Sequence, residues 1–121
     1  LQPRPVASTV RRVLRELLPT GAVGQDTVAS RLNRSLSTLQ RQLQAEGLSY
    51  RTLLDDTRRS LAEAYLQEAQ FTQAEIAYLL GFSDQSNFSR AYRRWTGRSP
   101  SEYSASQSAS QSASQNSSQD R

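Results

Sequence analysis

The chain has 121 residues, and its 15 basic side chains, all arginine, outnumber 11 acidic ones to give a net charge of +4, an excess that favours a polyanionic partner. Cysteine and histidine are absent, which removes disulfides, thiol nucleophiles, the common zinc ligands and the usual general base, so we expect no enzyme, no cofactor and no metal site. No apolar run approaches the roughly 18 to 20 residues of a membrane span, and no membrane partner is expected.

The N-terminal part of the chain predicts two helices. Ser8 can cap a helix over residues 10–18, in which apolar residues recur at intervals of three and four, and Gly21 follows its end. A second, short helix is expected over about residues 25–32. A tight break at Asn33 follows it, so the chain turns sharply before the next element.

The middle of the chain predicts a third helix and a much longer fourth one. Ser35 can cap the third helix, and Gly47 is a good left-handed terminator for it. Ser49 can cap the fourth helix, which we expect over about residues 49–67. A helix of that length would separate whatever packs at its two ends.

The C-terminal part predicts two more helices and a last short turn. Thr72 and Glu75 have the spacing of a reciprocal capping box, which opens the fifth helix. Ser83 or Asp84 can cap the sixth helix, and Pro100 suits the start of a final helical turn. No strand pattern is found anywhere, so the sequence predicts an all-α fold of about seven helices.

The order of these elements repeats. A short helix, a tight turn and a helix with one apolar and one arginine-bearing face occur twice, which predicts two helix-turn-helix subdomains at about residues 25–46 and 72–96. The long central helix, at about 49–67, joins them in one domain over 1–103. Residues 104–121 repeat Ser-Ala-Ser-Gln and predict a disordered tail, whether a flexible linker, a native tail or an added segment.

The third and sixth helices each divide into a packing face and a polar face. The polar face of the third carries Ser37, Gln40, Arg41 and Gln44, and that of the sixth carries Ser86, Asn87, Arg90, Arg93 and Arg94. Arginine can donate two hydrogen bonds to guanine in the major groove, and glutamine or asparagine can pair with adenine. We therefore expect double-stranded DNA as the partner, with base edges read mainly by Gln40, Arg41, Asn87 and Arg90. Phosphate contacts are assigned to Ser35, Thr38, Arg93 and Arg94.

The fourth helix has a length that suits this task. About 18 residues at ~1.5 Å each span ~27 Å, and neighbouring major-groove segments on one face of DNA lie ~34 Å apart. The fourth helix could therefore hold one reading helix at each of two neighbouring groove segments. A single molecule could then bind without dimerising.

Other interpretations of these residues are weaker. The basic face of a single amphipathic helix more often contacts only solvent and has no binding role. The repetition of the unit argues against that interpretation here. The spacing of Phe88, Tyr92 and Trp95 is that of a core stripe and disfavours a base-stacking platform. Asp55 and Asp56 each precede an arginine by three residues, which predicts surface ion pairs and not catalytic carboxylates.

Two segments, STLQRQLQAEGLSYRTLL and QAEIAYLLGFSDQSNFSRAYRRWTGRSPSEY, resemble the C-terminal DNA-binding domain of AraC/XylS-type regulators over about residues 22–103. The resemblance implies a seven-helix domain whose two subdomains enter successive major-groove segments. By position in the motifs, the family's base-contacting sites fall on Ser37, Gln40, Arg41, Gln85, Ser86, Asn87 and Arg90. Arg34 occupies a turn position that is commonly apolar in the family.

The resemblance implies a bacterial transcription regulator, in the cytoplasm at the nucleoid, that binds promoter DNA. Activation is the favoured output, with RNA polymerase as a further partner. Family members usually add an effector or dimerisation domain, and the absence of methionine suggests a fragment that lacks it. The effector, the oligomeric state and the target sequence stay open. From the residues alone, a helical protein-interaction module with basic faces and a structured-RNA binder are the alternatives.

Overall fold

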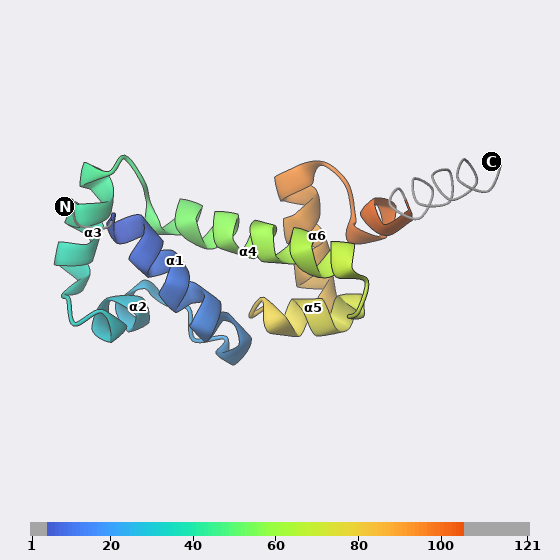
Figure 1. The fold of residues 1–121 in the computed structure, drawn as a ribbon, viewed down its shortest axis with the longest axis horizontal. Coiled ribbons are helices and arrows are strands. Elements are labelled where there is room, and N and C mark those ends of the chain that lie inside the picture. Colours follow the sequence, from blue (N-terminus) through green and yellow to red (C-terminus); the bar gives the residue numbers. More distant parts are fainter. Residues whose placement is uncertain (1–4, 106–121) are drawn as a thin grey trace, which may run out of the picture.

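The computed structural model describes residues 5–105, in which every regular element is a helix (Figure 1). In chain order these are α1 (Val6–Leu17), the short 3₁₀ helix η1 (Leu18–Thr20), α2 (Gln25–Arg31), α3 (Leu36–Ala45), α4 (Tyr50–Glu68), α5 (Gln73–Leu79) and α6 (Gln85–Thr96). Residues 100–105 form a last helical segment. The predicted all-α fold is confirmed. The predicted disordered tail lies, from residue 106 onward, outside the described residues.

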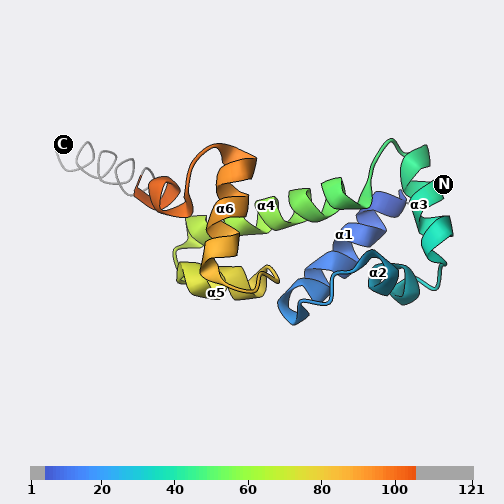
Figure 2. The ribbon, with the colours of Figure 1, turned by 180° about the vertical axis from the view of Figure 1, so that it is seen from behind.

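The helix α4 runs through the whole molecule and connects two separately packed halves, seen from opposite sides in Figures 1 and 2. Its 19 residues span about 28 Å at about 1.5 Å each. The N-terminal subdomain consists of α1, η1, α2, α3 and the first half of α4, and the C-terminal subdomain consists of the second half of α4 with α5 and α6. No helix in the described range is long and apolar enough to cross a membrane.

Each subdomain has its own apolar core. The most deeply buried large side chains of the N-terminal core are Val10, Val13, Leu14, Leu18, Val28, Leu39, Leu43 and Leu53, and those of the C-terminal core are Ile76, Leu80, Phe88 and Tyr92. Leu61 packs against both cores. Trp95, expected in the core, is only half-buried and lies at its edge, with its ring centroid 6.1 Å from that of Phe82.

Most helix starts follow the predicted caps. The Ser35 and Ser49 hydroxyls accept hydrogen bonds from backbone N–H groups three residues on, at 3.1 and 3.2 Å. Thr72 and Glu75 form the full capping box, with the Thr72 N–H donating to the carboxylate at 2.9 Å. Of the two candidates for α6, Asp84 is the cap and accepts from the Asn87 N–H at 2.8 Å. Local spacing therefore determines where these four helices begin.

The predicted cap of the first helix is wrong. The helix α1 begins at Val6, upstream of Ser8, whose hydroxyl donates instead to the Pro5 carbonyl. The Glu46 carboxylate accepts from the Val6 and Ala7 N–H groups at 2.7 and 3.0 Å. This cap comes from the end of α3, so it anchors the start of α1 to the helix that we expect to read DNA.

The turns between α2 and α3 and between α5 and α6 close in the same way. Each contains a residue in the left-handed region, Asn33 at φ 56° and Gly81 at φ 80°. In both, the next N–H donates to the carbonyl five residues back, as in a Schellman motif: Arg34 to Ala29 and Phe82 to Ala77, each at 2.9 Å. The half-buried Arg34 thus occupies in the first turn the position that Phe82 has in the second.

The two subdomains touch where the second turn approaches η1. A Cβ atom on Gly81 would lie 2.7 Å from the Leu18 carbonyl oxygen, closer than real Cβ atoms come to backbone. Gly97 also has a left-handed φ, of 84°, but a Cβ there would meet nothing within 4 Å. Only Gly81 is therefore required for a close approach as well as for its backbone conformation.

We expect Gly81→Ala to destabilise the protein more than Gly97→Ala. A left-handed alanine costs about 1–2 kcal/mol by itself, which is the expected effect at Gly97. At Gly81 the overlap with Leu18 should add roughly 1–3 kcal/mol, as overpacking does. Urea unfolding of the two variants measures the difference. Equal losses of unfolding free energy would contradict the close contact.

The capping box predicts a pH dependence of stability. The hydrogen bond from the Thr72 backbone N–H, with a smaller effect of the Thr72 side chain, lowers the pKa of Glu75 from its ordinary value of 4.5. A depressed folded-state pKa stabilises the protein above pH 4.5, and this contribution is lost as the pH falls through the folded-state pKa. The midpoint temperature of thermal unfolding of Glu75→Ala should therefore be lower than that of the wild type at pH 7 and should approach the wild-type value at pH 3. Glu68→Ala, at an exposed site, is the control and should show no such convergence.

Candidate nucleic-acid interface

The helix α3 presents the predicted polar face to solvent. Leu39 and Leu43 are buried in the N-terminal core, and Leu36 at the start of the helix is 40% exposed. The four residues expected to read bases are all exposed: Ser37, Gln40, Arg41 and Gln44. They occupy two turns of one face of α3, and a major groove is wide enough to admit an α-helix.

Two residues assigned to phosphate contacts form the start of this face. The hydroxyl of Ser35 donates to that of Thr38 at 2.8 Å while capping the helix, and Thr38 is half-buried. The Arg41 guanidinium lies 3.4 Å from the Thr38 hydroxyl, a long contact that leaves most of its donors free. A phosphate at this end would meet hydroxyls and a helix N-terminus together.

The helix α6 divides in the same way. Phe88, Ala91 and Tyr92 are buried in the C-terminal core. The exposed predicted residues are Gln85, Ser86, Arg90, Arg93 and Arg94, and only Asn87 is half-buried. Arg93 and Arg94 lie in the last turn, and neither forms an ion pair within residues 5–105. Their charge is therefore available to a phosphate.

Asn87 holds the side chain of Arg90. Its amide nitrogen donates to the Ser83 hydroxyl at 2.6 Å, and its amide oxygen accepts from the Arg90 guanidinium. The amide keeps one N–H and one oxygen lone pair, so Asn87 can orient Arg90 and still meet a base edge.

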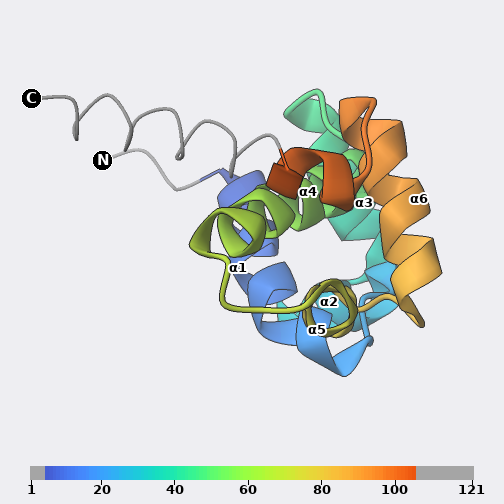
Figure 3. The ribbon, with the colours of Figure 1, turned by 90° about the vertical axis from the view of Figure 1, so that its right-hand side faces the viewer.

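The two helix-turn-helix units are related by a shift along α4. In Figure 1, α2 and α5 lie at one level and α3 and α6 at another, and in the end-on view of Figure 3 each pair lies on the same side of α4. Successive major-groove segments on one face of a duplex are likewise related by a shift of one helical turn, ~34 Å. The two pairs of helices are therefore related in the same way as successive groove segments, by a shift along one direction.

Arg58 from the middle of α4 holds the second turn in place. Its Nε donates to the Leu80 carbonyl at 2.8 Å, its Nη2 to the Gly81 carbonyl at 3.4 Å, and its guanidinium carbon lies 4.4 Å from the centroid of the Phe82 ring. Burial lowers the pKa of Arg58 from its ordinary value, and the nearby carboxylate of Asp55 opposes that shift. This half-buried cation fixes the turn that leads into α6.

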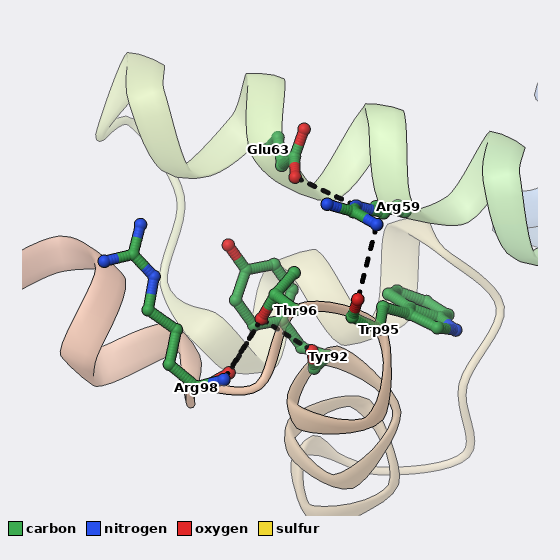
Figure 4. A network of polar contacts seen from close by, with 6 residues as sticks. All are labelled: Arg59, Glu63, Tyr92, Trp95, Thr96 and Arg98. Carbon is green, nitrogen blue, oxygen red and sulfur yellow. Dashed lines mark hydrogen bonds and ion pairs between the residues drawn. The ribbon is translucent and has the colours of Figure 1, made fainter.

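A second arginine of α4 holds the other end of α6 (Figure 4). Arg59 donates to the Glu63 carboxylate at 3.2 Å and to the Trp95 carbonyl at 3.3 Å, in the last turn of α6. Just beyond, the Thr96 hydroxyl lies 2.9 Å from the Tyr92 carbonyl oxygen and so closes the helix end. Two arginines of α4 thus hold α6 near both of its ends: Arg58 contacts the turn before it, and Arg59 contacts its last turn.

These contacts correct the ion pairs expected along α4. Asp55 pairs with Arg51 at 3.2 Å, four residues before it, and not with Arg58. Arg59 pairs with Glu63, also one turn away. The spacing of charges along α4 does not indicate that Arg58 and Arg59 contact backbone carbonyl groups of other elements.

Two further residues of the surface were not anticipated. Gln73 on α5 accepts from the Gln85 amide at 3.2 Å and donates to the Ser101 hydroxyl at 2.9 Å. Nothing in the local sequence indicates this pairing, because the partners are 12 and 28 residues away from Gln73.

The fold and this surface define a double helix-turn-helix DNA-binding domain. A helix-turn-helix domain family model matches residues 28–106 of the chain. The ornithine utilization regulator of Pseudomonas aeruginosa is 47% identical over 78 residues, which cover 64% of this chain and 23% of that protein. The regulator VirS of Mycobacterium tuberculosis is 43% identical over 91 residues, 75% of this chain and 27% of that one.

Among solved structures, the C-terminal domain of AraT, a response regulator from Geobacillus stearothermophilus, superposes with a TM-score of 0.74 at 28% identity. The match covers 85% of this chain and 86% of that one. The chain belongs to the AraC-type helix-turn-helix family of transcription regulators, as its motifs predicted. It spans about a quarter of the length of the curated relatives named above.

We expect Arg58→Met to destabilise the protein by about 1–3 kcal/mol, because it leaves the Leu80 and Gly81 carbonyls without their donors. Arg51→Met is the matched control, since it removes an exposed pair with Asp55 worth roughly 0.5 kcal/mol or less. Urea unfolding compares the two variants. A loss at Arg58 no larger than that at Arg51 would show that the Arg58 contacts with these carbonyls do not hold the turn.

Proposed function

We propose that this chain binds promoter DNA in a sequence-specific way and reads two successive major-groove segments with α3 and α6. The observation that carries the proposal is the shift along α4 that relates the two helix-turn-helix units, so that one molecule presents both helices to one face of a duplex. The proposed unit extends over residues 1–103, with the helix-turn-helix units at about 25–46 and 72–96. The function is binding, with no catalysed reaction.

The proposed roles follow from residue chemistry and exposure. Base edges are read by Ser37, Gln40, Arg41, Gln44, Gln85, Ser86, Asn87 and Arg90. Phosphates are held by Ser35, Thr38, Arg93 and Arg94. Arg41 and Arg90 are the principal readers because a guanidinium can donate two hydrogen bonds to one guanine, which is the commonest specific contact of this kind.

We further propose that the bound domain activates transcription, in the bacterial cytoplasm at the nucleoid, with RNA polymerase as a second partner. One relative supports this: the urease operon transcriptional activator of Escherichia coli is 35% identical over 78 residues, 64% of this chain and 26% of that protein. Because the chain matches only about a quarter of its relatives, an effector or dimerisation domain belongs to the proposed full-length protein.

The test is selection of bound duplexes from a random pool at near-physiological salt, followed by footprinting of the selected site. We expect a bipartite motif with elements about one helical turn apart, preferred over random duplex by ~10³-fold or more. A footprint confined to one groove segment would contradict the two-helix mechanism. No enrichment would favour a basic protein-interaction module or a structured-RNA binder instead.

Arg41→Ala and Arg90→Ala should each weaken binding to the selected site by about 1–3 kcal/mol and relax base preference at separate positions. Arg93→Ala should weaken binding to all sequences alike and reduce its salt dependence, as loss of a phosphate contact does. Titrations of the three variants on a panel of single-base changes separate these effects. Uniform weakening by Arg90→Ala would reassign that residue to the phosphates.

A further inference from the structure

Three side chains from three separate elements form one hydrogen-bonded line at the start of α6. The Gln85 Nε2 donates to the Gln73 Oε1 at 3.2 Å, and the Gln73 Nε2 donates to the Ser101 Oγ at 2.9 Å. Gln85 is the first residue of α6, Gln73 is the first of α5, and Ser101 lies in the segment 100–105. We call these three residues the glutamine network.

We propose that Gln73 is a positioning residue, which sets the orientation of the Gln85 amide and thereby determines the base preference of Gln85. This inference rests on the proposed function, in which Gln85 meets a base edge. Gln73 itself is half-buried and its hydrogen-bond partner Gln85 is exposed, so Gln73 acts through Gln85.

The hydrogen-bonding groups of the Gln85 amide explain how its orientation can determine a base preference. A primary amide carries an acceptor oxygen and a nitrogen with two donors, and a free glutamine can rotate to present either. The bond to Gln73 uses one N–H of Gln85 and leaves its oxygen and second N–H free. That pair, one acceptor and one donor, is the set that recognises adenine through N6 and N7.

The far end of the network is anchored by packing. Pro100, next to Ser101, is buried. The Tyr103 ring packs edge-on against Tyr92 of the core, with centroids 6.3 Å apart, and the guanidinium of Arg98 lies 5.0 Å from the Tyr103 ring centroid. Ser101 is therefore held by the C-terminal core, and the segment after α6 determines how a residue at the start of α6 is oriented.

The first test uses the free protein and needs no DNA. Gln73→Met keeps the length of the side chain and removes both of its hydrogen bonds. We expect the side-chain amide resonances of Gln85 in a ¹⁵N spectrum to shift in Gln73→Met. The matched control, Gln67→Met, removes an exposed glutamine of α4 and should leave them unchanged. Unchanged resonances in Gln73→Met would overturn the network.

The second test measures base discrimination on the selected site, at the position that Gln85→Ala identifies as read by Gln85. We expect Gln73→Met to reduce discrimination there by about fivefold or more, the lower range of one well-oriented base contact, and to leave other positions unchanged. In Gln73→Glu, the new carboxylate can still accept from Gln85 and from the Ser101 hydroxyl. That variant should keep the preference while its charge weakens binding to all sequences alike.

The outcomes separate the inference from the proposed function. A wild-type protein with no base preference, together with shifted Gln85 resonances, would overturn the reading function and with it the role of Gln73. A wild-type preference that Gln73→Met leaves intact, or lowers equally at every position, would overturn only the positioning role. Thermal unfolding of each variant establishes that it is folded, and Gln73→Glu keeps the test decisive where Gln73→Met is unstable.

Discussion

The contact between Arg58 and the second turn is the constraint on which the geometry of both reading helices depends. A helix of 19 residues can bend, and α4 alone would leave the two subdomains some freedom relative to each other. Arg58 attaches the turn before α6 to α4, and Gly81 lets that same turn lie directly on the Leu18 carbonyl of the N-terminal subdomain. The glycine and the arginine act together, because a Cβ atom at position 81 would lie 2.7 Å from the Leu18 carbonyl oxygen and 3.4 Å from the Arg58 Nη2. The distance between α3 and α6 is therefore a tertiary property and not a property of one helix.

The turns of the two helix-turn-helix units have the same backbone structure but different side chains. Both turns use a left-handed residue and the same backbone bond back to the preceding helix. At the next position the second turn has Phe82, whose ring receives Arg58, and the first has Arg34, whose Nη1 is buried with no hydrogen-bond partner in the described part of the chain. A buried donor without a partner is costly, so the Arg34 side chain carries a cost that Phe82 does not.

Sequence reasoning succeeded where the determinant is local. The caps at Ser35, Ser49 and Thr72 and the division of α3 and α6 into two faces depend on spacings of three and four, which can be counted along the chain. It failed where the partner is distant in sequence: Glu46 caps α1 from 40 residues away, and Arg58 meets carbonyls 22 and 23 residues on. The same limit hid Gln73, since amphipathic spacing places a residue on a face and says nothing of its neighbour on another helix.

The two reading helices differ in how far their side chains are held before DNA arrives. On α6, Asn87 holds Arg90 and Gln73 holds Gln85. On α3, Arg41 has one long contact of 3.4 Å, and neither Gln40 nor Gln44 makes a side-chain hydrogen bond within residues 5–105. A held side chain loses less freedom on binding and cannot turn to suit a different base, whereas a free one adapts at an entropic cost. On the proposed function, base discrimination is therefore stricter at α6, and α3 reads its bases with side chains that adapt more readily.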